Sequence, residues 1–190
     1  MAGAIPIRFR RLAYGAGMPT IQRLPENNNS VAKMGVPIAL TSGYVDQSAA
    51  ITDNNNMFIG FSTEYGKNRA ADGVAETAHY GSVINQANAV NIAVGTPMDD
   101  GNMGVLMAAP GVRFMGALTS ANNIAAAQLG ATMGLTEDAN NYWYVDPAKN
   151  NQASGGCVKI TDLVDPVGTA AGRVEFEVIN ARIQTLSQQT

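Results

Sequence analysis

The sequence predicts a mainly β protein, and three observations support that class. From residue 35 onward, short apolar runs alternate with turns rich in Gly, Pro, Asn and Asp, which is the pattern of strands joined by turns. Residues 173–178 alternate strictly between apolar and charged side chains, as a half-buried strand does. The chain shows no heptad pattern and no internal repeat. We therefore expect a single β-barrel or β-sandwich domain with long loops and an extended N-terminal arm.

Residues 1–34 are predicted to be that arm, and residues 35–190 the β-rich body. Pro6, Pro19 and Pro25 supply no N–H to a sheet and disfavour helix before them. Residues 1–25 carry four arginines and no acid, whereas the rest of the chain has eight basic and fifteen acidic residues. Because the arm also holds apolar side chains that a disordered tail would lack, we expect it to bind a partner surface. The residues expected to contact that partner are Ile5, Ile7, Arg8, Phe9, Arg10, Arg11, Leu12 and Arg23.

The body contains a series of predicted strands, each bounded by Gly, Pro, Asn or Asp. They cover residues 36–40, 57–61, 90–94, 105–109, 112–118, 143–145, 158–163 and 173–178. After the last strand, Ile179, Ala181 and Ile183 continue the apolar set one residue out of phase, which predicts a β-bulge near residues 179–180.

Helical signals are few. Residues 120–129 have a possible N-cap at Ser120 and end before Gly130, which predicts a helix of about two or three turns. Residues 69–80 are rich in Ala but contain Gly73, so we expect an irregular segment or a short helix there.

The composition excludes most catalytic and metal chemistry. A single cysteine, Cys157, excludes an internal disulfide and a cysteine-rich zinc site, and a single histidine, His79, excludes paired-histidine metal sites. Cys157 begins an apparent strand, so we expect a buried small side chain rather than a nucleophile with His79 as its base. No G-x-S-x-G motif is present. We predict no enzymatic activity, no metal site and no cofactor.

Three weaker motifs are assigned to structure rather than to chemistry. Gly15-Ala16-Gly17 lacks the third glycine of a nucleotide-binding loop and is followed by Pro19. The Asp and Asn clusters at residues 53–56 and 99–102 lack the spacing of a calcium loop and are expected to form turns. Glu175 and Glu177 share one face of a strand, which we assign to solvent rather than to acid–base catalysis.

The aromatic run Tyr142-Trp143-Tyr144 places Trp143 on one strand face and both tyrosines on the other. Exposed tyrosines would suit a sugar or a partner protein, whereas a buried Trp143 makes this an ordinary aromatic strand. We expect Trp143 in the core, with Tyr142 and Tyr144 at a contact between subunits.

The charge balance bears on partners. The net charge is −3 and the isoelectric point is about 5.0, whereas nucleic-acid-binding domains are usually basic, so we expect no nucleic-acid partner. No apolar run is long enough for a membrane span, and the N-terminal residues lack the apolar core of a secretory leader. Charged residues make up only 14% of the chain, which leaves little to keep copies apart, so we expect self-association.

Several segments resemble the capsid decoration (cement) proteins of tailed bacteriophages. The resemblance rests on residues 35–40, 43–45, 58–61, 110–116, 143–146 and 172–178, and it is spread over residues 35–183. It implies a β-barrel or β-tulip body, often a homotrimer, on the outer surface of a phage head. Such a protein is made in the host cytoplasm, binds the major capsid protein and stabilises the capsid lattice, and it has no catalytic residues.

Two other functions are open at this stage. One is a structural protein of a phage tail tube or neck, for which a long stacking loop would be expected. The other is a small β-barrel carbohydrate-binding module, which would need a polar cluster that the sequence does not display.

Overall fold

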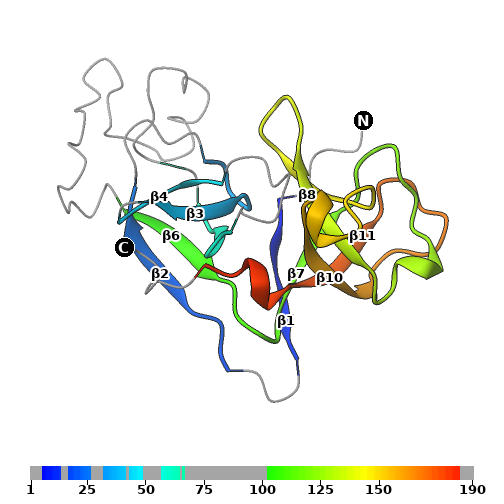
Figure 1. Ribbon diagram of the computed structural model, residues 1–190, viewed down its shortest axis with the longest axis horizontal. Coiled ribbons are helices and arrows are strands. Elements are labelled where there is room, and N and C mark those ends of the chain that lie inside the picture. The colour runs from blue at the N-terminus through cyan, green and yellow to red at the C-terminus, as the bar shows by residue number, and fades with distance from the viewer. Residues whose placement is uncertain are drawn as a thin grey trace.

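The structure is a computed structural model, and it describes residues 6–13, 17–26, 32–41, 43–48, 57–64, 66 and 102–184. The predicted mainly β class is confirmed, because the described strands form two antiparallel sheets (Figure 1). Helical structure in these residues is limited to short 3-10 turns. Neither sheet closes into a barrel, so the fold is the sandwich-like alternative.

Sheet A has six strands, in the spatial order β1-β7-β11-β10-β8-β9. All of its neighbouring strands pair antiparallel. The strands are β1 (Arg8–Leu12), β7 (Val112–Ala117), β8 (Thr132–Glu137), β9 (Trp143–Asp146), β10 (Gly156–Leu163) and β11 (Arg173–Val178). The strand predicted at residues 173–178 is confirmed as β11, and it lies in the middle of the sheet between β7 and β10.

Sheet B has five strands, in the order β2-β6-β5-β3-β4. The strands are β2 (Ile21–Pro25), β3 (Pro37–Thr41), β4 (Tyr44–Gln47), β5 (Gly60–Ser62) and β6 (Asn102–Met107). Gly60 is required at the junction of β5 and β6, because a Cβ atom there would lie 2.1 Å from the carbonyl oxygen of Leu106. The predicted strand at residues 90–94 and the segment at residues 69–80 lie outside the described residues.

Both sheets curl until their ends come close. In sheet A, Leu118 at the end of β7 forms an isolated parallel bridge with Val145 in β9. In sheet B, Glu26 at the end of β2 forms the same kind of bridge with Val45 in β4. The bridge in sheet B joins its two end strands, whereas the bridge in sheet A joins the end strand β9 to the second strand, β7. A single bridge is not a strand ladder, so each sheet remains open.

The core lies between the two sheets and is continuous across them. Phe61 from sheet B packs against Phe114 and Phe176 from sheet A, with ring centroids 4.6 Å and 6.1 Å apart. Phe58 adds an edge-on contact to Phe61 at 5.5 Å. All four rings are buried. Because truncating a buried Phe costs about 3–5 kcal/mol, this cluster is a large part of what joins the sheets.

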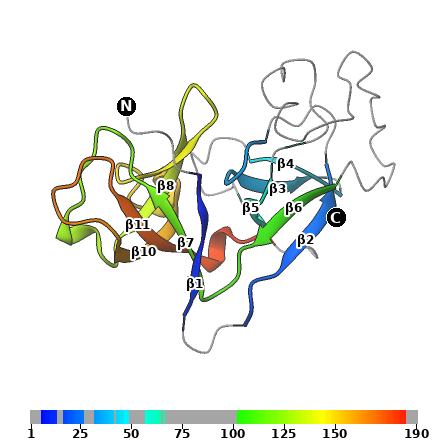
Figure 2. The ribbon, with the colours of Figure 1, turned by 180° about the vertical axis from the view of Figure 1, so that it is seen from behind.

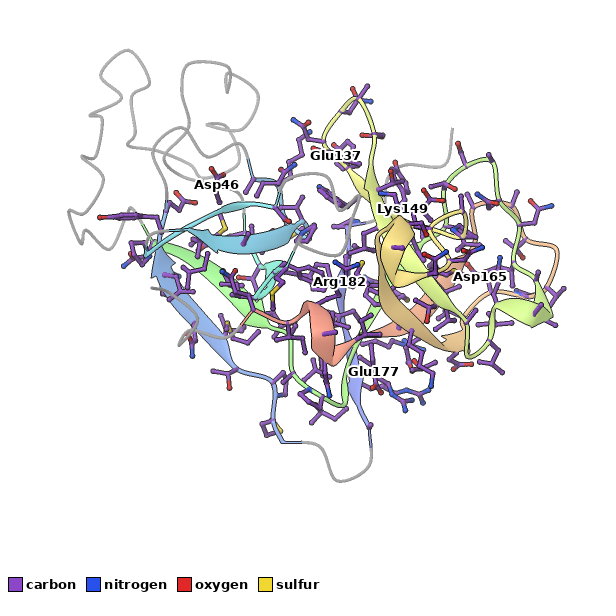
Figure 3. All side chains as sticks on the ribbon, in the orientation of Figure 1. Asp46, Glu137, Lys149, Asp165, Glu177 and Arg182 are labelled. Carbon is purple, nitrogen blue, oxygen red and sulfur yellow. The ribbon has the colours of Figure 1, made fainter. Side chains whose placement is uncertain are left out.

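The C-terminal segment ties sheet A to sheet B. After β11 the chain makes a 3-10 turn, Asn180–Arg182, and Arg182 is buried between the sheets (Figure 3). The Gln184 side chain then makes two hydrogen bonds to the backbone of Leu40 in β3: its carbonyl accepts from the N–H at 2.9 Å, and its amide donates to the oxygen at 2.8 Å. The β-bulge predicted at residues 179–180 is therefore wrong, because the strand ends at Val178 and the chain turns toward sheet B.

The helix predicted at residues 120–129 is also wrong, since only Ala126–Gln128 form a 3-10 turn. Tertiary hydrogen bonds take the backbone groups that a helix would need. The Ile124 N–H donates to the oxygen of Thr169 at 2.9 Å, and the Ile124 oxygen accepts from the N–H of Gly168 at 2.8 Å. Ile124 is buried in the core, so packing decides the local backbone.

The N-terminal segment is not an arm separate from the body in its described residues. β1 pairs with β7 over Arg8–Leu12, and β2 pairs with β6 over Ile21–Pro25. Ile7 is 2% exposed and belongs to the core. Residues 1–34 were expected to be an extended arm that lies on a partner surface, and in the described residues the strands of this segment and Ile7 lie instead on the sheets and core of the same chain.

Candidate functional site

The N-terminal strands form one outer edge of each sheet. β1 is the first strand of sheet A and β2 the first strand of sheet B; in Figure 2, β1 runs through the middle of the view and β2 lies at the outer edge of sheet B. An edge strand presents backbone N–H and C=O groups on one side without a strand neighbour. The arginines that the sequence analysis selected therefore lie on sheet edges.

A bulge in β1 directs two successive arginines toward one carboxylate. The pairing with β7 shifts register between Phe9 and Arg11, so Arg10 is the extra residue. The Nε atoms of Arg10 and Arg11 lie 4.0 Å and 2.8 Å from Oε2 of Glu175. In a regular strand, neighbouring side chains would point to opposite faces.

Glu175 is the centre of this group, although it is only 1% exposed. Its Oε1 accepts hydrogen bonds from Arg11 Nη2 at 3.1 Å, from Arg113 Nη1 at 3.1 Å and from the Thr161 hydroxyl at 3.0 Å. These donors come from three different strands, β1, β7 and β10. The carboxylate of Glu175 thus links three strands on the outer face of sheet A. The sequence-based assignment of this side chain to solvent is wrong.

Other charges extend the group across the face. Arg113 Nε donates to Glu177 at 3.0 Å, and Arg11 Nη2 donates to Asp162 at 3.3 Å. Strand register places Arg8 and Lys159 on the same face, opposite Met115 and Glu177 respectively. We call this set the outer-face cluster: Arg8, Arg10, Arg11, Arg113, Lys159, Thr161, Asp162, Glu175 and Glu177. Glu177 is seen below the 3-10 turn in Figure 3.

The cluster holds its carboxylate ionised. Burial of Glu175 opposes ionisation, but hydrogen bonds from Arg11 and Thr161 and the positive charge of Arg11 outweigh it, so the pKa of Glu175 lies below its usual value. Desolvation lowers the pKa of Arg113, and the hydrogen bonds to Glu177 and Glu175 more than reverse this, so that pKa is raised. Basic residues outnumber acidic ones in the cluster.

Part of the positive charge faces solvent. The side chains of Arg10 and Arg11 are 51% and 52% exposed. Arg8 is exposed and has no hydrogen-bond or ion-pair partner within the described part of the chain. Phe9 in the same strand is 39% exposed. The outer face of the β1 edge therefore offers the exposed guanidinium of Arg8 beside the part-exposed ones of Arg10 and Arg11, and Phe9, opposite Phe114, lies on the other face of the strand.

The β2 edge has a similar character. Arg23 is 53% exposed, with Nη2 lying 3.3 Å from Glu64 and donating to the Asn102 oxygen at 3.2 Å. Ile21 in the same strand is 60% exposed, and Met18 just before it is 83% exposed. Two exposed apolar side chains and a part-exposed arginine thus lie together along the β2 edge.

The other residues predicted to bind a partner divide into two groups. Ile7 is buried in the core and Leu12 is partly buried against it, so neither is available to a partner. Ile5 lies outside the described residues. Of the set chosen from the sequence, the structure brings Arg8, Phe9, Arg10 and Arg11 together on one edge and places Arg23 on another.

Trp143, the first residue of β9, lies in the core as predicted and is 3% exposed. Both tyrosines are half-buried and have partners within the chain. The Tyr144 hydroxyl donates to Asp138 at 3.2 Å, and Lys33 Nζ lies 4.2 Å from the centre of the Tyr142 ring. Desolvation and the charge of Asp138 raise the pKa of Tyr144. Their predicted role at a subunit contact stays a prediction.

The residues considered for catalysis or metal binding form no site in the described structure. Cys157 is fully buried, as predicted, and burial raises its pKa to about 12, so it is a neutral thiol. His79, residues 53–56 and residues 99–101 lie outside the described part. Where residues are described, no three His, Cys, Asp or Glu side chains are placed to hold a metal ion. No described helix has the length and apolar character needed to cross a membrane.

Sequence reasoning missed the residues that organise the site. Arg113 and Thr161 were not selected because each is an unremarkable member of a strand, and Glu175 was assigned to solvent. The strict alternation of residues 173–178 does place Glu175 on the outer face. What no local pattern shows is that β1, more than a hundred residues away in sequence, supplies the arginines that cover it.

Comparison of the chain with protein-family models, with curated protein sequences and with solved structures finds no match.

Proposed function

We propose that this chain is a non-catalytic structural protein that binds an acidic protein surface through its β1 and β2 edges. We further propose that this surface is the outer face of a tailed-phage head, where the chain acts as a decoration protein that stabilises the major capsid protein lattice. The observation that carries the proposal is the placement of Arg8, Arg10 and Arg11 on one sheet edge, with Phe9 part-exposed on the other face of the same strand.

The chemistry of the edge favours a carboxylate-bearing protein partner. A guanidinium group forms two parallel hydrogen bonds with a carboxylate, which a lysine ammonium cannot do. Exposed ion pairs contribute only about 0–1 kcal/mol each, so they select the partner more than they hold it. Burial of Phe9, Ile21 and Met18 on contact would supply most of the affinity, at about 25 cal/mol per Å² of apolar surface.

The phage-head assignment rests on the resemblance described above together with the low charge of the chain. Charged residues make up 14% of it, which suits a protein whose surface is covered in an assembly. A protein that only coats a lattice also needs no catalytic group, in keeping with the buried, neutral Cys157.

The test is binding of the purified full chain to emptied, expanded heads of the phage that carries its gene. We expect the protein to sediment with the heads and to raise their melting temperature. Arg8→Gln and Arg10→Gln should each weaken binding and reduce its salt dependence. Lys159→Gln is the matched control, since it removes one exposed charge from the same face but away from the edge.

Two results would overturn the proposal. One is failure of the folded chain to bind heads, including the case in which it binds isolated tails or necks instead. The other is equal binding by the wild type and by the Arg8→Gln/Arg10→Gln double variant, which would remove the β1 edge from the contact.

A further inference from the structure

Two loops form a charge-free surface at the end of sheet A that lies away from sheet B. They are residues 119–131 and residues 166–171, which appear side by side at this end in both views (Figures 1 and 2). Neither segment contains an Asp, Glu, Lys or Arg residue. We call this surface the end platform. Its two segments together approach the size of one side of a standard protein interface, about 20–30 residues.

The end platform is held by hydrogen bonds and is built before any partner arrives. Asn123 and Ala170 form an isolated antiparallel bridge, and the Ala171 N–H donates to the oxygen of Asn122 at 2.9 Å. The Gln128 side chain accepts from the N–H of Ala125 and donates to the oxygen of Asn123, both at 3.0 Å. A surface that is already ordered loses little conformational entropy on binding.

Two large apolar side chains stand on this platform. Leu129 is 57% exposed and Val167 is 62% exposed, and the alanines at residues 125–127 are exposed beside them. Among the described residues, the other large apolar side chains with this much exposure are Met18 and Ile21, which belong to the β2 edge. Exposed apolar surface is therefore concentrated in separate places, and only the end platform combines it with the absence of charge.

The rim of the platform carries an ion pair on the side of residues 166–171 and one exposed lysine, Lys159 opposite Thr132, on the side of residue 131. Arg173 binds Asp165 through Nη2 at 2.6 Å and Nε at 3.0 Å, and the backbone N–H of Arg173 donates to the same carboxylate at 2.7 Å. An apolar centre surrounded by a polar, solvent-accessible rim is the usual anatomy of a protein–protein contact.

We propose that the end platform is the surface through which copies of this chain bind one another. A contact with two-fold symmetry pairs the same surface patch of both copies. On the β1 edge this would place arginines against arginines, and like charges directly opposite one another are destabilising. On the end platform no like charges meet, so self-association there has no cost in charge repulsion. It buries Leu129 and Val167.

This inference does not rest on the proposed binding to phage heads. It assigns the platform to the second copy and leaves the basic edges for a different, acidic partner. The end platform is uncharged and the edges are basic, and they consist of different residues, so one can be changed without altering the other.

The test is the oligomeric state of the full chain, measured by sedimentation velocity over a range of protein concentrations. We expect the wild type to associate and the Leu129→Asp/Val167→Asp variant to be monomeric at every concentration. Ile21→Asp is the matched control, since it places an acid at an equally exposed apolar position on the β2 edge, and it should associate like the wild type. Circular dichroism and thermal unfolding of each monomeric sample establish that it is folded.

A second readout uses the chemistry of cysteine. The only native cysteine is buried, so Val167→Cys introduces a single accessible thiol. We expect a bifunctional thiol cross-linker to join copies of Val167→Cys, and the Leu129→Asp change in the same chain to abolish that product. A wild type that is monomeric throughout, or a double-aspartate variant that associates like the wild type, would overturn the proposal.

Discussion

At the scale of single residues, Glu175 shows how a charged side chain is tolerated in a nearly closed environment. An isolated buried carboxylate is costly, and here Arg11, Arg113 and Thr161 supply its hydrogen bonds from three strands. The arginines keep part of their surface in water, so only one of the partners bears the full cost of desolvation. Removing the carboxylate charge should leave two guanidinium groups without their main acceptor.

We therefore expect Glu175→Gln to lower the free energy of unfolding by about 1–3 kcal/mol, since it weakens several charge-assisted hydrogen bonds at once. Glu177→Gln is the matched control. Glu177 lies two residues along the same strand, is more exposed and bonds Arg113 alone among the described residues, so its loss should be clearly smaller. Urea unfolding measures both. Equal losses in the two variants would contradict the central role of Glu175.

The acid dependence of stability follows from two carboxyl groups. Hydrogen bonds from Arg173 lower the pKa of Asp165, and the arginines and Thr161 outweigh burial to lower the pKa of Glu175. In the unfolded chain these groups have values of about 3.9 and 4.3. Because the unfolded state binds more protons in acid, the stabilisation is complete above these values and is lost as the pH falls through the lower folded ones. We expect urea unfolding to show this decline, and Asp165→Asn and Glu175→Gln each to flatten it. An unchanged acid slope in both variants would refute the assignment.

At the scale of elements, the sequence predicted strands that have a strong local pattern of apolar and polar residues. It did not predict strands that form only because of their tertiary pairing. The alternation at residues 173–178 predicted β11 with its observed bounds. β8 has the sequence TMGLTE, whose Gly and Thr residues give no clear alternation, and it was missed. β propensity depends on what a strand packs against, so such a segment cannot be identified locally.

The N-terminal strands show the same limit more sharply. Prolines and clustered arginines suggested an arm that lies on a partner surface, and in the described residues its strands pair within the same chain. The partner of β1 is β7, and the partner of β2 is β6. The candidate residues Arg8, Phe9, Arg10 and Arg11 were selected for their charge and apolarity, and these properties hold wherever the strand lies. That Arg10 and Arg11 both contact Glu175 depends on the fold, because β1 meets β7 and β11 only in the folded sheet.

We expect deletion of residues 1–34 to prevent folding rather than to leave an intact body. The deletion removes one strand from each sheet, the core side chain of Ile7 and the guanidinium groups that cover Glu175. Solubility, circular dichroism and thermal unfolding of the truncated chain measure the outcome. The full chain with Arg8→Gln and Arg10→Gln should fold normally and serves as the control. A truncated chain that melts cooperatively near the wild-type temperature would show that the N-terminal strands are dispensable.

At the scale of the whole molecule, the two sheets share one core and are crossed repeatedly by the chain. β1 lies in sheet A and β2–β6 in sheet B, β7–β11 return to sheet A, and Gln184 is bonded to sheet B. Phe61 packs against Phe114 and Phe176 across the interface. Neither sheet keeps a closed apolar interior without the other.

We therefore expect the two sheets to unfold in one cooperative transition. Trp143, the only tryptophan, is buried in sheet A and reports on that sheet by fluorescence. Hydrogen exchange of the Ile59 amide, which donates to Ile38 at 2.8 Å, reports on sheet B. The free energies obtained from the two probes should agree. Phe61→Ala should lower both together, by about 3–5 kcal/mol. A lower value for sheet B alone would mean that the sheets unfold separately.

The pairing of the first strands with late ones also sets an order of events during synthesis. Arg8 lies opposite Met115, and Ile21 lies opposite Leu106, so β1 and β2 leave the ribosome long before the strands that will receive them. Through that interval Ile7, Ile21 and Phe9 remain in water, where unpaired apolar strands are prone to associate with other chains. Neither sheet can be completed until β6 and β7 have emerged. Contacts between residues so distant in sequence form slowly, which makes the nascent chain, rather than the finished fold, the stage most exposed to aggregation.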